Sequence, residues 1–211
     1  MEPITDGLAL LPGTPEIASV ASVLLHLSMQ PLADYWMGVP DSETAQTILA
    51  KLFRASNNLF SHQFATYAQV EGQAVGFELS YPARTMKALE LPTAIRFAGI
   101  AGIATSIRMV VHSYPLQSIT EAAADECFLA HLAVLPEFEG RGYGRELLKR
   151  AEAKARASGL RRLTLTVDAD NSRAINLYER AGFVVTGTSM FESLRRRFAY
   201  QGYHHMAKPL S

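Results

Sequence analysis

The sequence has few cysteines and no excess of charge of either sign. Cys127 is the only cysteine among the 211 residues, so no disulfide can form within the chain and a metal site built on several cysteines is excluded. Lys plus Arg and Asp plus Glu number 20 each, which gives a formal net charge of zero. A neutral chain has no overall field that would attract nucleic acid or an anionic membrane, so we expect neither as a partner.

Targeting and membrane signals are also scarce. The N-terminal sequence MEPITD has neither the basic region nor the apolar core of a signal peptide, and the simplest interpretation is a cytoplasmic protein. The uncharged stretch from Phe97 to Ile107 is too short to cross a bilayer. The length of the chain fits one domain with a sizeable core.

What the sequence does contain is a strand, a glycine-rich loop and a helix in direct succession. Cys127 to Leu135 is an apolar run with the length of a buried strand, and Pro136 ends it. The loop runs from Gly140 to Gly144. After it, apolar residues recur at helical spacing until a glycine that fits a helix C-cap: Leu147, Leu148, Ala151, Ala155 and then Gly159.

This unit favours an anionic ligand. Free backbone N–H groups and the helix dipole place partial positive charge at the start of the helix. Glycines allow a ligand close to the backbone, and Arg141 and Arg145 add formal charge. A pyrophosphate would fit such a site. The alternative is a tight strand-to-helix turn without a ligand.

The same stretch resembles the acetyl-CoA-binding motif of the GNAT superfamily of N-acetyltransferases. The resemblance lies in Leu132-Ala133-Val134, Pro136-Glu137, the loop and Leu147-Leu148. The first position of the family motif Q/R-x-x-G-x-G/A is here Glu139. The resemblance implies acetyl-CoA as cosubstrate, bound along the backbone of the strand and by the loop. The implied binding residues are Leu132, Ala133, Val134, Gly140, Arg141, Gly142, Tyr143, Gly144 and Arg145.

A second motif follows at the distance that the family leads us to expect. Asn171 to Phe183 reads N-x-x-A-x-x-L-Y-x-x-x-G-F, which is similar to the later GNAT motif. Asn171 and Tyr178 are two helical turns apart, with Ala174 between them on the same face, and the resemblance implies that all three contact the cofactor. Without the resemblance, they read as an N-capping asparagine and a core tyrosine.

The resemblance implies attack of an amine on a thioester. The backbone N–H of Val134 would hold the developing oxyanion, and Tyr178 would be the general acid that protonates the departing thiolate.

The general base is less well defined. Strand alternation places Glu126, Phe128 and Ala130 on the substrate side, and of these only Glu126 could act as a base. His131 has a suitable pKa range but the opposite parity, which favours a core histidine. Glu78 on the neighbouring strand is a further candidate.

Residues Pro82 to Asp125 form a long insert between two expected strands. Thr93 to about His112 reads as one helix that is apolar nearly all round, interrupted mainly by Arg96 and Arg108. We expect this helix to be a buried lid or an oligomer contact, so a homodimer is possible.

The resulting expectation is an α/β fold with a single GNAT-like domain over residues 1–211. A mixed central sheet is flanked by helices, and the helical insert, about residues 82–125, lies between the third and fourth strands. The expected function is transfer of an acetyl group from acetyl-CoA to a primary amine of a small molecule. The alternative is a non-catalytic acyl-CoA sensor. The other expected strands cover residues 8–11, 64–70, 74–81, 163–167, 183–190 and 202–208. One further expected helix ends near residue 28, and two others cover residues 43–54 and 173–181. Residues 31–40 are expected to be irregular.

Overall fold

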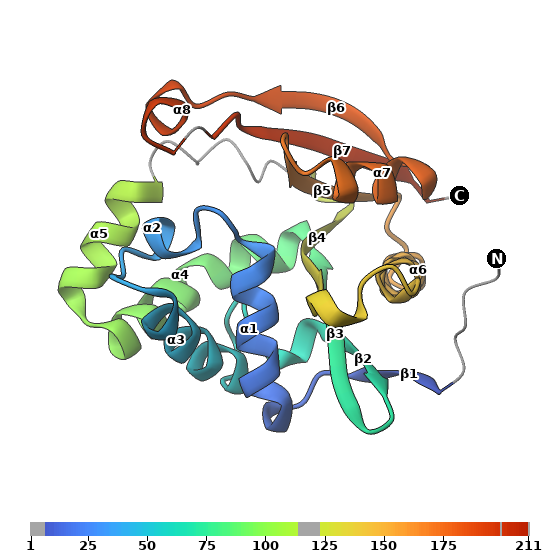
Figure 1. Cartoon of the computed structure of the whole chain (residues 1–211), viewed down its shortest axis with the longest axis horizontal. Helices are drawn as coiled ribbons and strands as arrows, with labels where there is room; N and C mark the ends of the chain where they lie inside the picture. The colour runs from blue at the N-terminus through green and yellow to red at the C-terminus, as the bar shows by residue number, and fades with distance from the viewer. Residues whose placement is uncertain (1–6, 114–122, 199, 211) are drawn as a thin grey trace.

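Seven strands form a single sheet in the computed structural model, which describes residues 7–113, 123–198 and 200–210 (Figure 1). Their order is β1-β2-β3-β4-β5-β7-β6, and every neighbouring pair is antiparallel except β4 and β5. The expected mixed sheet is therefore confirmed. The strands are β1 Leu8–Pro12, β2 Ala65–Val70, β3 Gln73–Pro82, β4 Glu126–Val134, β5 Arg162–Asp168, β6 Val184–Ser189 and β7 Tyr203–Pro209.

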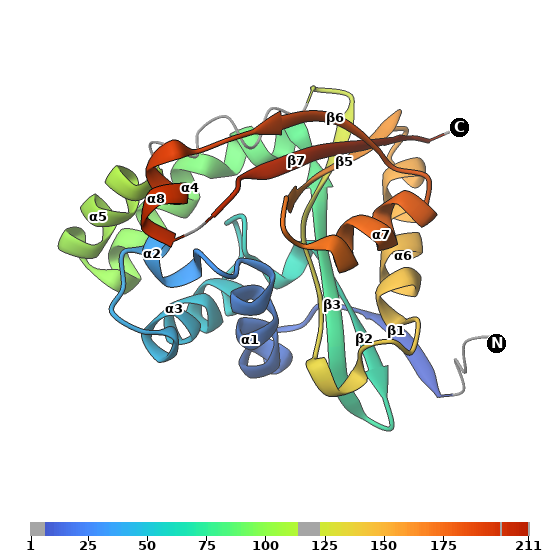
Figure 2. The same cartoon turned by 45° about the horizontal axis from the view of Figure 1, so that its top comes forward.

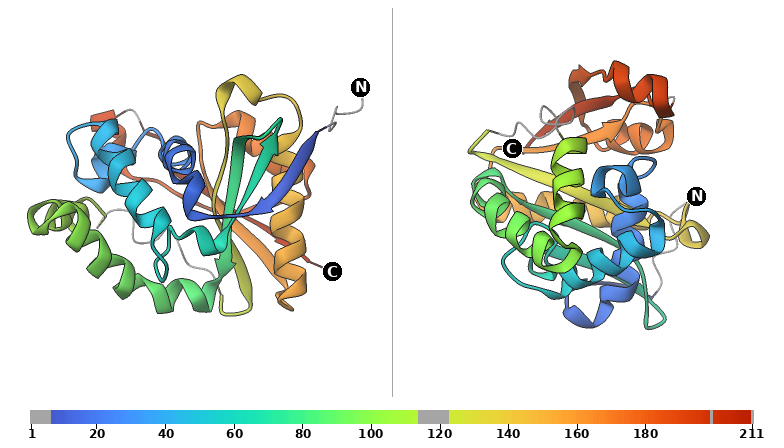
Figure 3. Two further views of the ribbon diagram at one scale, coloured as in Figure 1. Left: turned by 90° about the horizontal axis from the view of Figure 1, so that it is seen from below. Right: turned by 90° about the vertical axis from the view of Figure 1, so that its left-hand side faces the viewer.

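Helices cover both faces of the sheet. One face packs on α1 and α3, and the other packs on α6 and α7 (Figures 1 and 2). The view from below shows the sheet between these two layers (Figure 3). The helices are α1 Ala18–Ser28, α2 Ala33–Met37, α3 Ser42–Arg54, α4 Ala83–Ala101, α5 Ile103–Ser113, α6 Tyr143–Ala157, α7 Ser172–Arg180 and α8 Glu192–Phe198.

Alternation along β3 divides its side chains between the two layers. Phe77 and Leu79 are fully buried in the core that contains α1 and α3. Glu78, also fully buried, points the other way and pairs with Lys154 of α6, whose Nζ lies 2.8 Å from Glu78 Oε1 and 2.8 Å from the carbonyl oxygen of Phe64. Because an unpaired buried carboxylate is costly, Lys154 fixes the position of α6 against the sheet.

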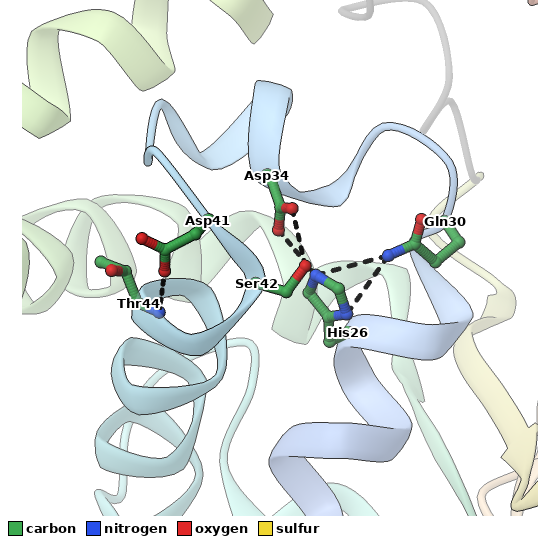
Figure 4. Close-up of polar contacts among 6 residues, drawn as sticks. All are labelled: His26, Gln30, Asp34, Asp41, Ser42 and Thr44. Atoms are coloured by element: carbon green, nitrogen blue, oxygen red, sulfur yellow. Dashed lines mark hydrogen bonds and ion pairs between the residues drawn. The ribbon is translucent and has the colours of Figure 1, made fainter.

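A polar cluster joins α1, α2 and α3 (Figure 4). Asp34 of α2 accepts from His26 Nε2 at 2.6 Å and from Ser42 Oγ at 2.8 Å, so one carboxylate contacts three helices. Asp41 caps α3, since its Oδ1 accepts from the N–H of Thr44 at 2.7 Å. The expectation that residues 31–40 are irregular is wrong, because this cluster supports the short helix α2.

The insert forms two helices rather than one. It begins at Ala83, and Gly102, with φ of +83°, separates α4 from α5. Pro92 lies inside α4 but does not end the helix. The hydroxyl of the neighbouring Thr93 donates to the carbonyl of Leu89 at 2.6 Å and accepts from the N–H of Leu59 at 2.9 Å. The position of the insert between β3 and β4 is as expected.

Much of the apolar surface of the insert is exposed, which does not fit a buried lid, one of the two expectations from the sequence. Phe97 is buried against the core, but six large apolar side chains are at least 60% exposed: Leu91, Ile95, Ile103, Ile107, Val110 and Val111. The other side of α5 supports α2, where Arg108 Nε donates to the carbonyl of Gly38 at 2.9 Å and His112 stacks on Tyr35. Contact with a second copy stays a prediction. Within the described ranges, no helix has the length and apolar character needed to cross a membrane.

We expect the two sides of α4 to contribute very differently to stability. Phe97→Ala removes a side chain that is 2% exposed and should lower the free energy of unfolding by roughly 3–5 kcal/mol. Ile95→Ala, on the same helix but 65% exposed, is the matched control and should change it by less than about 0.5 kcal/mol. Chemical denaturation of the two variants measures the difference, and equal losses would contradict the packing described for α4.

Candidate functional site

The strands β4 and β5 pair over three residues and then separate. Their parallel register joins Glu126, Cys127 and Phe128 to residues 162–164, while β5 continues to Asp168 alongside β7. The remaining part of β4 therefore has no strand partner on the β5 side. Buried main-chain groups normally need hydrogen-bond partners, so this edge of β4 is a place where an extended ligand can bind.

The direction of the free N–H groups follows from the pairing of β4 with β3. The N–H of Leu135 donates to the carbonyl of Val75 on the β3 side at 2.8 Å. Since successive N–H groups along a strand point to opposite edges, those of Val134 and Leu132 point into the opening. The main chain of Leu132, Ala133 and Val134 therefore lies along this opening. That it binds a ligand stays a prediction.

A β-bulge in β4 changes which side chains face this opening. The register with β3 shifts so that Leu79 pairs with His131 and Ser80 pairs with Leu129, leaving Ala130 unpaired. One extra residue reverses the alternation. His131 consequently lies on the same face as Phe128, with its ring 5.7 Å from that of Phe60 and 6.5 Å from that of Phe77 between centroids. The expectation that His131 has the opposite parity is wrong.

The glycine loop has the backbone conformation that the motif requires. Gly140 and Gly142 have φ of +76° and +87°, a region that residues with a side chain rarely adopt. No side chain caps the start of α6 at Gly142, so its first N–H groups are available to a ligand. Arg145 lines the cavity described below, whereas Arg141 donates to the carbonyl of Glu137 and lies over the Phe138 ring.

The helix α7 forms the opposite wall. Asn171 Oδ1 caps it by accepting from the N–H of Ala174 at 3.0 Å, as the structural alternative suggested, and both residues also line the cavity. Tyr178 is buried, its ring lies 5.7 Å from that of Phe183, and burial raises its pKa above the usual range. The phenol therefore stays protonated at neutral pH.

An ion pair connects the loop to α7. Glu139, at the first position of the glycine motif, pairs with Arg173 near the start of α7, and both residues line the cavity. The acidic residue at this position is thus neutralised by a cation from the opposite wall.

These elements surround one cavity of about 1340 Å³. Its other wall comes from α1, α2, β3, β4 and the segment that follows α3, and it is mainly apolar and aromatic. The residues that give it this character are Leu27, Met29, Leu32, Trp36, Phe60, Tyr81 and Phe128. The cavity therefore combines a polar main-chain edge with an apolar chamber.

The hydrogen bonds of His131 define its tautomer. Ser28 Oγ donates its single proton to the carbonyl of Leu25 at 2.7 Å. The contact of 2.9 Å between Ser28 Oγ and His131 Nδ1 must then be donated by Nδ1, which leaves Nε2 as an unprotonated acceptor. Burial lowers the pKa of His131 to about 4, so the ring is neutral at pH 7.

The other candidate bases lie elsewhere. Glu126 does not line the large cavity; it pairs with Arg162 at 3.1 Å and accepts from the N–H of Ala123. Glu78 is held by Lys154 on the α6 side. The sequence reasoning missed Asp168, which lines the cavity at the end of β5; its only sequence signal is its place three residues before the second motif.

Comparison with family models matches residues 34–183 to the acetyltransferase (GNAT) family. This span includes the opening of β4, the glycine loop and α7. A solved structure with a similar fold is an N-acetyltransferase from Staphylococcus aureus Mu50, with a TM-score of 0.71 and 18% identity over 95% of this chain and 100% of that one.

Curated relatives align over shorter segments. The mycothiol acetyltransferase of Propionibacterium freudenreichii subsp. shermanii is 35% identical over 78 residues, which are 37% of this chain and 25% of that protein. The ribosomal protein bS18-alanine N-acetyltransferase of Salmonella typhimurium is 42% identical over 66 residues, which are 31% of this chain and 45% of that protein. The chain thus spans less than half the length of either relative.

The desolvated position of His131, which is partly buried, predicts a specific pH dependence of stability. In the unfolded chain the imidazole protonates near pH 6.5, but in the folded chain only near pH 4. The unfolded state therefore binds more protons between these values, and His131 makes the free energy of unfolding fall as the pH drops through this window.

The variant His131→Asn keeps a donor toward Ser28 and removes the titration. The free energy of unfolding of the wild type relative to the variant should decrease by on the order of 1–3 kcal/mol between pH 7 and pH 4. Urea denaturation at several pH values measures this difference. Parallel stability curves for the two proteins would contradict burial of a neutral imidazole.

Proposed function

The chain belongs to the acetyltransferase (GNAT) family, and we propose that it transfers an acetyl group from acetyl-CoA to a primary amine of a small molecule. The observation that carries this proposal is one cavity that contains the unpaired edge of β4, the glycine loop and Tyr178. These are the groups that a thioester substrate with an extended arm and a pyrophosphate requires.

The residues present fit acetyl-CoA. The main chain of Leu132 to Val134 would bind the pantetheine arm as an added strand, and the N–H groups at the start of α6, with Arg145, would bind the pyrophosphate. When bound, acetyl-CoA supplies an acetyl thioester that an amine can attack. The N–H of Val134 points into the opening and would stabilise negative charge on the carbonyl oxygen during attack.

Tyr178 is the proposed general acid. Burial raises the pKa of Tyr178, so the phenol is protonated at neutral pH and has a proton to donate. As a weak acid it would donate this proton only as negative charge develops on the sulfur during cleavage of the C–S bond. The C–S bond breaks as the amine nitrogen bonds to the acetyl carbon, and the phenol proton passes to sulfur.

His131 is the proposed acceptor of the amine proton. Its Nε2 is free of a proton because Nδ1 donates to Ser28, and its low pKa keeps it neutral at physiological pH. The bulge at Ala130 turns this side chain to the cavity. Glu126, the candidate from strand alternation, is held by Arg162 outside the cavity.

The apolar wall supports a small acceptor rather than a protein tail. Trp36, Phe60 and Phe128 line a chamber that would accept an apolar group. The names of the two relatives cover both possibilities, since one refers to mycothiol and the other to an alanine of a ribosomal protein.

The amine specificity can be measured directly. We expect thiol release from acetyl-CoA in the presence of small apolar amines and little release with a peptide that begins with alanine. An acyl-CoA sensor would bind acetyl-CoA in calorimetry and release thiol with neither class. Preference for the peptide would show that the acceptor is a protein.

The variant Tyr178→Phe tests the general acid. It removes only a hydroxyl, so packing against Phe183 should persist, while turnover should fall by about a hundred- to ten-thousand-fold. Affinity for acetyl-CoA should change little, because the main-chain contacts remain, and the loss should appear in kcat. Wild-type turnover when chemistry limits the rate would assign Tyr178 to the core alone.

A further inference from the structure

Asp168 lines the cavity where β5 ends. It pairs in register with Tyr203 of β7, so the two side chains lie next to each other on one face of the sheet, and both line the cavity. In the described part of the chain, Asp168 Oδ1 is buried without a hydrogen-bond partner, and the hydroxyl of the nearby Tyr200 interacts with Tyr203. Tyr200 is 2% exposed, and its ring lies 5.1 Å from that of Tyr203 between centroids.

This arrangement is unfavourable in the absence of a ligand. Burial raises the pKa of Asp168 to about 6. A hydrogen bond from the Asp170 backbone N–H lowers this pKa, whereas the charge of Asp170 raises it. At neutral pH the carboxyl group is still mostly ionised. A buried ionised oxygen without a partner costs stability.

The charges that line the cavity are divided between its two ends. Its arginines all come from α6 and α7: Arg145, Arg173 and Arg180. The wall formed by α1, α2 and β4 has no lysine or arginine among the described residues. Because Arg173 is paired with Glu139, an anionic ligand is attracted mainly by Arg145 and Arg180. Asp168 lies at the apolar chamber, because its neighbour Tyr203 packs with Leu32 of that chamber.

We propose that Asp168 binds the acceptor as its ammonium ion, with the tyrosine pair beside it, and that the acceptor is an amine on an apolar or aromatic body without a carboxylate of its own. The ammonium releases one proton to solvent before the neutral amine attacks, and His131 accepts the second. This inference rests on the proposed acetyl transfer. The aromatic wall binds the apolar or aromatic part of the acceptor. Asp168 binds the positive charge of the acceptor and repels a carboxylate on the same molecule.

Phenylethylamine and phenylalanine are suitable probes because they share the aromatic body and differ by a carboxylate. The wild type should bind phenylethylamine more tightly than phenylalanine. In Asp168→Asn, affinity for phenylethylamine should fall roughly ten- to a hundred-fold, the usual effect of losing a charged hydrogen bond. Affinity for phenylalanine should stay equal or rise. Calorimetry in the presence of CoA measures the affinity for each of the two probes without any turnover.

The exposed Asp170 provides the matched control, since Asp170→Asn removes a carboxylate two residues away that does not line the cavity. It should leave amine binding within about two-fold of wild type, well below the effect of a charged hydrogen bond. In both variants affinity for acetyl-CoA should be retained. In steady-state kinetics, the loss in Asp168→Asn should appear as a raised KM for the amine.

The outcomes separate this proposal from the proposed function. Equal losses for both probes, or no loss, would assign Asp168 to a structural role with bound water and overturn the proposal. Absence of amine binding to the wild type would overturn it as well. Amine binding that depends on Asp168 without thiol release would uphold Asp168 as the cation site and reject acetyl transfer.

Discussion

The separation of β4 from β5 after three paired residues is the constraint on which the rest of the site depends. A parallel pair that continued along β4 would satisfy the main-chain groups of Leu132 and Val134 and leave no room for a ligand. Because the strands diverge, these groups need another partner, and a ligand that lies along the strand edge can supply it. The glycine loop and α7 then lie on either side of the same opening.

The bulge at Ala130 determines which chemistry faces this opening. Before the bulge, Phe128 faces the α1 layer and Leu129 faces the α6 layer. After the bulge, His131 faces the α1 layer and Leu132 faces the α6 layer. A regular strand would direct the imidazole away from Ser28 and into the layer beneath α6. The bulge thus joins an apolar chamber, a neutral imidazole and the free strand edge in one cavity.

Each face of the sheet carries a buried carboxylate. On the α6 side, Glu78 Oε1 pairs with Lys154, while Glu78 Oε2 has no hydrogen-bond partner within the described residues. On the cavity side, Asp168 Oδ1 likewise has no partner there. The two differ in position: Asp168 lines the cavity, so a ligand that enters the cavity can bind its carboxylate.

The sequence by itself determined the features that depend on neighbouring residues. The strand, glycine loop and helix from Cys127 to Gly159 and the strands expected over 64–70 and 74–81 all follow from local conformational preferences. The tertiary structure alone decided where β4 and β5 stop pairing, that Ala130 bulges, that Arg162 holds Glu126, and that Asp168 reaches the cavity. These outcomes depend on contacts between residues distant in the chain, and a one-residue change in register reverses every side chain that follows.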